Sequence, residues 1–192
     1  MAKKRVNSKN KKRNNNNINN KNKKISYLFI RYILLLLLMF SLPLIYKIFY
    51  KPTFYSVVLI MKLFSKELLY DVTLGTISID KIVSIEIIPA CIAGSAYLLL
   101  LILNLSVDMK LQKRIYTILL SFFLFFIINV TRIIVLSLLY LNNTDIFYFV
   151  HIITWYAISI VLVVLIWFFI VKIFSIKEIP FYSDIKLLKI NK

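Results

Sequence analysis

Long apolar runs fill most of the sequence from residue 27 onward, and they constrain the fold more than any other feature. An α-helix needs about 20 consecutive apolar residues to cross the hydrocarbon core of a membrane. Charged residues make up only 17% of the chain, whereas soluble domains carry about 25%. We therefore expect an all-α polytopic membrane protein with about four transmembrane helices, at residues 27–49, 88–107, 115–140 and 146–174.

The segment between the first two predicted spans, residues 51–87, has a different pattern. Over residues 54–69 the apolar side chains recur at helical spacing, which predicts an amphipathic helix lying in the membrane interface. Residues 76–87 alternate between apolar and polar, with Asp80-Lys81 between the two halves, which predicts a short β-hairpin. A hairpin has unpaired edges that cannot rest in hydrocarbon, so we expect this segment to lie outside the membrane core.

Basic residues collect outside the predicted spans and indicate an orientation. They lie in the tail 1–24, in the loop 108–114 and in the tail 177–192, whereas segment 51–87 balances its lysines with acids. The positive-inside rule then places both termini in the cytoplasm, with residues 25–176 forming a multi-pass domain of the cell membrane. Segment 51–87 and the polar turn 141–145 would face outward.

The formal net charge of +17 raises the question of a nucleic-acid partner. Its placement in tails and loops, not on one face of a folded domain, argues against one. The tail 1–24 has almost no apolar residue and no acid, so we expect it to be disordered. A position near anionic lipid on the cytoplasmic side explains such a tail, and an RNA-binding arm is the alternative.

Three chemically reactive side chains are predicted at a similar depth on the outer side. Cys91, the only cysteine, opens the second span, and His151, the only histidine, lies near the start of the fourth. Arg132 lies roughly 12 Å below the outer end of the third span, at 1.5 Å per residue, and its side chain can reach upward. A thiol at a helix N-terminus beside a cation is the environment of a thiolate nucleophile. An arginine inside a membrane is costly and indicates function.

Each of these residues also has a purely structural explanation. Cys91 alone would be a small buried hydrophobe, His151 an interfacial histidine with a satisfied hydrogen bond, and Arg132 a side chain that snorkels to headgroups or pairs with Glu86. Asn129 precedes Arg132 by three residues, so it shares the same helical face and can orient it. One Cys and one His without a nearby carboxylate do not make a ligand set, so neither a metal nor another cofactor is expected.

The order of these motifs resembles the exosortase/archaeosortase family. The motifs are Ala90-Cys91-x-x-Gly94 at the start of one span, Asn129-x-x-Arg132-Ile133 late in the next, and His151 at the start of the last. The similarity covers about residues 70–170, including the hairpin before the cysteine. It implies a compact archaeal-type cysteine transpeptidase, or endopeptidase, that cleaves C-terminal sorting signals of exported proteins. These signals consist of a short motif, a membrane helix and a basic cluster, and the cleaved protein passes to a lipid or other acceptor.

The resemblance also implies roles for the three residues. Cys91 would form an acyl-thioester, Arg132 would donate the proton and His151 would stabilise the transition state. The chemistry of the side chains alone favours the reverse for the last two, because imidazole titrates near neutral pH and arginine stays protonated. Both assignments stay open. Glu86 is a supporting candidate that could pair with Arg132, orient His151 or face solvent.

Two other functions compete with a transpeptidase. One is a hydrolytic intramembrane protease, which would use water as the acceptor. The other is a non-enzymatic membrane adaptor or transporter subunit, in which Arg132 binds a lipid headgroup or a partner helix.

Overall fold

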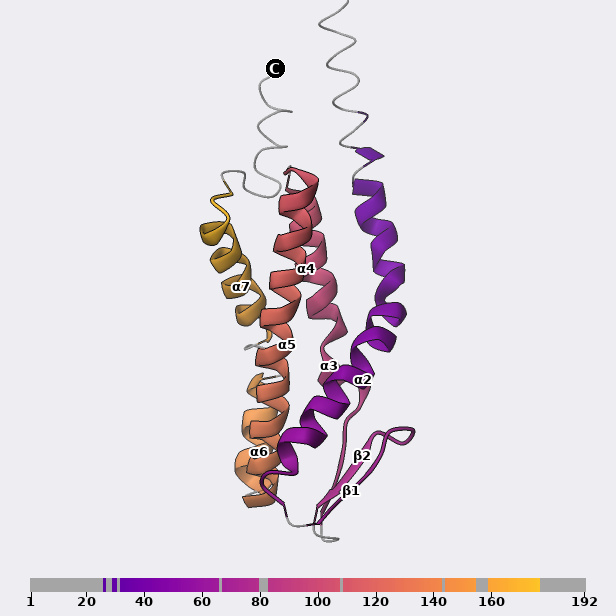
Figure 1. Ribbon diagram of the computed structural model, residues 1–192, viewed down its shortest axis with the longest axis vertical. Coiled ribbons are helices and arrows are strands. Elements are labelled where there is room, and N and C mark those ends of the chain that lie inside the picture. Colours follow the sequence, from indigo (N-terminus) through magenta and orange to yellow (C-terminus); the bar gives the residue numbers. More distant parts are fainter. Residues whose placement is uncertain are drawn as a thin grey trace, which may run out of the picture.

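The longest helix, α5 (Leu111–Asn142), runs along the whole molecule, and the other elements are arranged beside it (Figure 1). The computed structural model describes residues 26, 29–30, 32–65, 67–79, 83–107, 109–142, 144–154 and 159–176. The other elements in these ranges are η1 (Met39–Ser41), α2 (Leu42–Met61), β1 (Leu68–Asp71), β2 (Thr76–Ile79), β3 (Val83–Glu86), α3 (Pro89–Ile92), α4 (Gly94–Ser106), α6 (Thr144–Ile153) and α7 (Ser159–Ile173). The predicted tails 1–24 and 177–192 and the predicted turn at Asp80-Lys81 lie outside the described residues.

Within the described residues, three helical segments are long and apolar enough to cross a membrane, which indicates a membrane protein, as the sequence predicts. They are Tyr32–Met61, Pro89–Ser106 and Leu111–Asn142. Within the predicted fourth span the structure describes α6 and α7, and residues 155–158 between them lie outside the described residues. Helix α7 has only 15 residues. A helix of that length rises roughly 22 Å, less than the hydrocarbon core of about 30 Å. A fourth crossing, made by α6 and α7 together, therefore stays a prediction.

The prediction of a separate interfacial helix over residues 54–69 is wrong. α2 continues the first span through Pro52 to Met61, and the chain then enters β1 at Leu68. The predicted apolar stripe is buried, but it packs against the sheet and α5, through residues Phe54, Val57, Val58 and Met61. Helical spacing of apolar residues shows that one face of a helix is covered, and it does not distinguish a protein cover from a lipid cover.

The predicted hairpin forms, and an additional strand extends it. β2 and β3 pair antiparallel, with Ile77 opposite Ile85, and β1 pairs with the other edge of β2. The strand order is β1-β2-β3, so β3 is an edge strand. Ile77 is buried, whereas the hydroxyl oxygens of Ser78 and Ser84 lie 2.9 Å apart on the exposed face. The alternation of apolar and polar residues therefore predicted the buried and exposed faces of the sheet correctly.

The predicted second span is interrupted after a single turn. Pro89 begins α3 as expected, but α3 ends at Ile92, and Ala93 has a left-handed backbone with φ 54° and ψ 46°. This conformation costs a residue with a Cβ about 1–2 kcal/mol, so neighbouring contacts must hold it. Helix α4 then starts at Gly94, where an added Cβ would lie 2.6 Å from the Tyr46 ring. Helices α2 and α4 therefore approach each other closely beside the break.

We expect Gly94→Ala to destabilise the protein, because its new methyl group would overlap the Tyr46 ring. Overpacking of this kind costs about 1–3 kcal/mol, so the midpoint of thermal unfolding in detergent micelles should fall. Ser95→Ala, at an exposed position of the same turn, is the matched control. Gly94→Ala should lower the unfolding midpoint less in a Tyr46→Ala background than in the wild type, because the ring that the new methyl group would meet is gone. An unchanged midpoint for Gly94→Ala would contradict the close approach of α2 and α4.

Candidate active site

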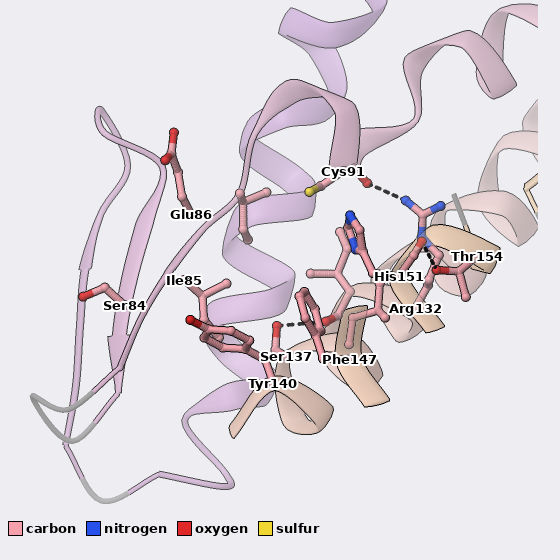
Figure 2. Close-up of a pocket in the computed structure, with 13 residues that line it drawn as sticks. Ser84, Ile85, Glu86, Cys91, Arg132, Ser137, Tyr140, Phe147, His151 and Thr154 are labelled. Carbon is pink, nitrogen blue, oxygen red and sulfur yellow. Dashed lines mark hydrogen bonds between the residues drawn. The ribbon is translucent and has the colours of Figure 1, made fainter. Parts of the chain in front are cut away.

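A cavity of about 280 Å³ lies between β3, α3, α5 and α6 (Figure 2). It is lined by Ser84, Ile85, Glu86, Ile87, Cys91, Arg132, Ile133, Leu136, Ser137, Tyr140, Phe147, His151 and Thr154. The structure thus brings Cys91, Arg132 and His151 to one cavity from three different helices. The apolar part of the wall comes mainly from β3 and α5, and the reactive side chains lie at the end nearer α3.

The thiol of Cys91 and the ring of His151 are directed toward the same part of this cavity (Figure 2). Both residues are partly buried. The ring of Phe147, one turn earlier on α6, packs against the His151 ring with the centroids 5.3 Å apart. Tyr140 from α5 packs edge-on against Phe147, with a centroid distance of 5.0 Å. Aromatic packing across α5 and α6 therefore limits the orientations open to the imidazole.

The guanidinium of Arg132 binds the backbone that carries the thiol. Its Nη2 donates a hydrogen bond of 3.1 Å to the carbonyl oxygen of Cys91, and its Nη1 donates one of 2.9 Å to Ser159 Oγ. The Ser159 hydroxyl in turn donates to the carbonyl oxygen of Thr154, at 2.9 Å. Arg132 therefore connects the break between α3 and α4 with Ser159, which begins α7, and through it with Thr154, which follows α6.

Asn129 binds the same turn from one helical turn earlier on α5. Its Nδ2 lies 3.1 Å from the carbonyl oxygen of Cys91 and 3.2 Å from that of Ile92. Because the chain turns at Ala93, these carbonyls lack the donors that a continuous helix would supply. Unsatisfied backbone groups are costly in an apolar setting, and the side chains of Asn129 and Arg132 take the place of the missing amides. The predicted shared face of Asn129 and Arg132 is confirmed by their common acceptor.

Glu86 lines the rim of the cavity, but its side chain is exposed and is directed away from Cys91 and His151 (Figure 2). Of the three arrangements considered for Glu86, the structure therefore has the one in which the carboxylate faces solvent. The helix dipole at Cys91 is also weaker than the sequence predicts. Helix α3 has only four residues, and a single turn supplies little of the macrodipole of a long helix.

Ser159 and Thr154 were not among the site residues predicted from the sequence. Their signal was present, because both are hydroxyl residues inside an otherwise apolar run, where a polar group needs a hydrogen-bond partner. The hydroxyl of Thr154 bonds back to the carbonyl oxygens of Val150 and His151, in the last turn of α6. Within the described ranges, no group of three or more His, Cys, Asp and Glu residues is placed to hold a metal ion.

Comparison with known proteins gives no match to a protein-family model, a curated protein or a solved structure. The resemblance noted in the sequence therefore stays a prediction. Function must be inferred from the site itself, which combines a thiol, an imidazole and a guanidinium around one cavity.

We expect Asn129→Ala to loosen the turn that carries Cys91, because the carbonyl oxygens of Cys91 and Ile92 lose a shared donor. A buried polar group left without a partner costs about 1–3 kcal/mol, so thermal stability in micelles should fall and Cys91 should react faster with a water-soluble maleimide. Asn142→Ala is the control, because its amide also bonds a carbonyl oxygen of α5, but at the exposed end of the helix. Equal stability and equal maleimide rates in the two variants would show that Asn129 does not hold the turn.

Proposed function

We propose that this protein is a membrane-embedded cysteine transpeptidase, resembling the exosortase/archaeosortase family, that processes C-terminal sorting signals of exported proteins. The observation that carries the proposal is the convergence on one cavity of the only cysteine, the only histidine and an arginine from inside an apolar helix. The residues come from three helices that are separate in the sequence. Peptide-bond attack needs this combination of a nucleophile, a proton-transfer group and a cationic or hydrogen-bonding partner for the oxyanion.

The proposed reaction has two steps. The thiolate of Cys91 attacks the scissile carbonyl carbon, an S–C bond forms, the C–N bond breaks, and the leaving amine takes a proton. A hydroxyl or amine of the acceptor, a lipid or another molecule, then attacks the thioester. Its oxygen or nitrogen bonds to the carbonyl carbon, the sulfur leaves as thiolate, and the acceptor gives its proton to the group that protonated the amine.

We assign the proton transfer to His151 and the electrostatic role to Arg132. The His151 ring is directed toward the same space as the thiol (Figure 2), and imidazole can both accept and donate a proton near neutral pH. Arg132 donates to the Cys91 carbonyl and to Ser159, which fixes the guanidinium beside the nucleophile. From there its charge can stabilise the thiolate and the developing oxyanion. This assignment follows the side-chain chemistry and not the roles implied by the family.

The competing functions fit the site less well. An adaptor that binds lipid through Arg132 needs a guanidinium directed outward, whereas both terminal nitrogens of Arg132 donate to groups within the protein. A purely hydrolytic protease needs ready access of water. The cavity wall is rich in apolar side chains, which favours an acceptor other than water.

We also propose that the cavity faces the outside of the cell. The sheet and the α5–α6 turn lie at one end of the molecule, and the α4–α5 connection and the C-terminal end of α7 lie at the other (Figure 1). The second end carries the basic residues Lys110, Lys113, Arg114 and Lys172. The positive-inside rule assigns that end to the cytoplasm. Both termini are then cytoplasmic, which requires α6 and α7 to complete a fourth crossing.

Cys91→Ala should abolish processing, because no other thiol is present to form the thioester. His151→Ala should slow processing by about 10²–10⁴-fold, the usual contribution of a general acid–base. Thr131→Ala, at an exposed position next to Arg132, is the control and should process normally. The measurement is the size, by immunoblot, of a tagged exported protein that ends in a short motif, an apolar helix and a basic cluster. The mass of its new C-terminus identifies the acceptor.

Normal processing in the Cys91→Ala variant would refute the enzyme proposal. A product that ends in a free carboxylate, with no acceptor attached, would instead support the hydrolytic protease.

The orientation is tested by labelling single cysteines in a Cys91→Ala background. Leu74→Cys lies in the exposed β1–β2 turn, and Lys110→Cys lies in the exposed α4–α5 connection. We expect a membrane-impermeant maleimide to label Leu74→Cys on intact cells, and Lys110→Cys only after lysis. The opposite pattern would contradict the orientation without bearing on the chemistry of Cys91.

A further inference from the structure

The outer edge of β3 borders the cavity together with the face of the strand that carries Ile85. Four consecutive residues from Ser84 to Ile87 line it, although successive side chains of a strand point to opposite faces of the sheet. Figure 2 shows the side chains of Ser84 and Glu86 on the side of the strand away from Cys91, and Ile85 on the opposite side. The contribution of Ser84 and Glu86 to the cavity therefore comes mainly from the strand edge.

The hydrogen bonds of the sheet show which backbone groups lie on that edge. The N–H of Ile87 donates to the carbonyl oxygen of Gly75, on the side of β2, at 2.8 Å. In an antiparallel ladder the N–H and C=O groups of alternate residues point to the same edge, so Ile85 also faces β2, while Ser84 and Glu86 face outward. In the part of the chain that the structure describes, no backbone group pairs with these outward groups.

The position of this edge relative to the thiol is the second observation. Strand β3 ends at Glu86, and Cys91 follows after the short connection into α3. The thiol and the β3 edge line the same cavity, together with the apolar side chains of Ile133 and Leu136 from α5. An extended chain laid along β3 would thus have its backbone held by the sheet while it lies beside the nucleophile.

We propose that the outer edge of β3 binds an extended segment of the substrate as an added strand, next to the bond that Cys91 attacks. This inference rests on the proposed function. The main-chain groups of Ser84 and Glu86 supply the hydrogen bonds, and the apolar wall receives alternate side chains of the substrate. A site of this kind fixes the direction and register of the peptide backbone and accepts a range of side chains. Specificity then comes from the few side chains that enter the cavity.

The test compares two thiol reagents on the full chain in detergent micelles. The first is an N-acetyl-trivalyl chloromethyl ketone, whose methylene carbon forms a bond to the Cys91 sulfur as chloride leaves. The second is iodoacetamide, which has no peptide backbone to pair. Ser84→Pro removes an outward N–H without breaking the β2–β3 ladder. Tyr70→Pro is the matched control, because its register with Ile77 places its N–H on the outer edge of β1, at the opposite side of the sheet.

We expect Ser84→Pro to lower the rate of the peptide reagent about tenfold, the effect of losing a hydrogen bond, and to leave the iodoacetamide rate unchanged. Tyr70→Pro should change neither rate. A peptide reagent that is N-methylated at its central valine, or at the neighbouring one, should show a similar loss on the wild-type protein. This second measurement decides the matter if Ser84→Pro fails to fold.

Equal rates for the plain and both N-methylated reagents on the wild-type protein would overturn strand addition at β3. Strand addition would also be overturned if the ratio of the peptide-reagent rate to the iodoacetamide rate were no higher in the wild type than in Ser84→Pro. These outcomes are independent of the processing assay, in which normal activity of Cys91→Ala overturns the proposed function itself.

Discussion

Backbone carbonyls that lose their helical partners inside an apolar setting must find other donors, and the site depends on this constraint. The left-handed residue Ala93 ends α3 and frees the carbonyl oxygens of Cys91 and Ile92. Asn129 and Arg132 project from the same face of α5 and supply the missing donors. The polar residues of the third span and the break in the second therefore explain each other. Without the break these side chains would have no backbone acceptor there, and without them the break would leave its carbonyls unsatisfied.

Arg132 also fixes the position of α6 relative to α3 along the axis of α5. Through Ser159 it reaches the carbonyl oxygen of Thr154, at the end of the helix that carries His151. One continuous helix, α5, thus binds the break between α3 and α4, and through Ser159 at the start of α7 it also binds the end of α6. Irregular backbone at membrane depth is tolerated where it is buried in protein or lines a cavity, and here it lines the cavity of the thiol and the imidazole. Rigid positioning of both groups by one helix is what nucleophilic catalysis requires.

The parts predicted correctly from the sequence are those with a periodic pattern. Period two identified β2 and β3, and the long apolar runs identified the three helices that can cross a membrane. The errors concern what each segment packs against. The buried stripe of α2 that ends at Met61 packs on the sheet and not on lipid. Ala93 separates α3 from α4, although alanine is a good helix former. Tertiary contacts produce the break at Ala93, since Gly94 approaches the ring of Tyr46 and Asn129 binds the freed carbonyl oxygens. That Cys91, Arg132 and His151 lie close together was predicted from their similar depth in the membrane. The contact of Ser159 with Arg132 could be found only from the fold.

A structural role for Arg132 does not account for its charge. The amide of Asn129 binds the same Cys91 carbonyl oxygen without a charge, whereas an arginine in the middle of a membrane helix costs about 2.5–3.5 kcal/mol. No carboxylate forms an ion pair with Arg132 in the described ranges, and Glu86 is directed elsewhere (Figure 2). The charge thus lies next to Cys91, and both hydrogen-bond acceptors of its terminal nitrogens are neutral. In the proposed reaction, the anion that forms, first the thiolate and then the oxyanion, would supply the missing counter-charge. Stabilisation that appears only when this anion forms is what accelerates a chemical step.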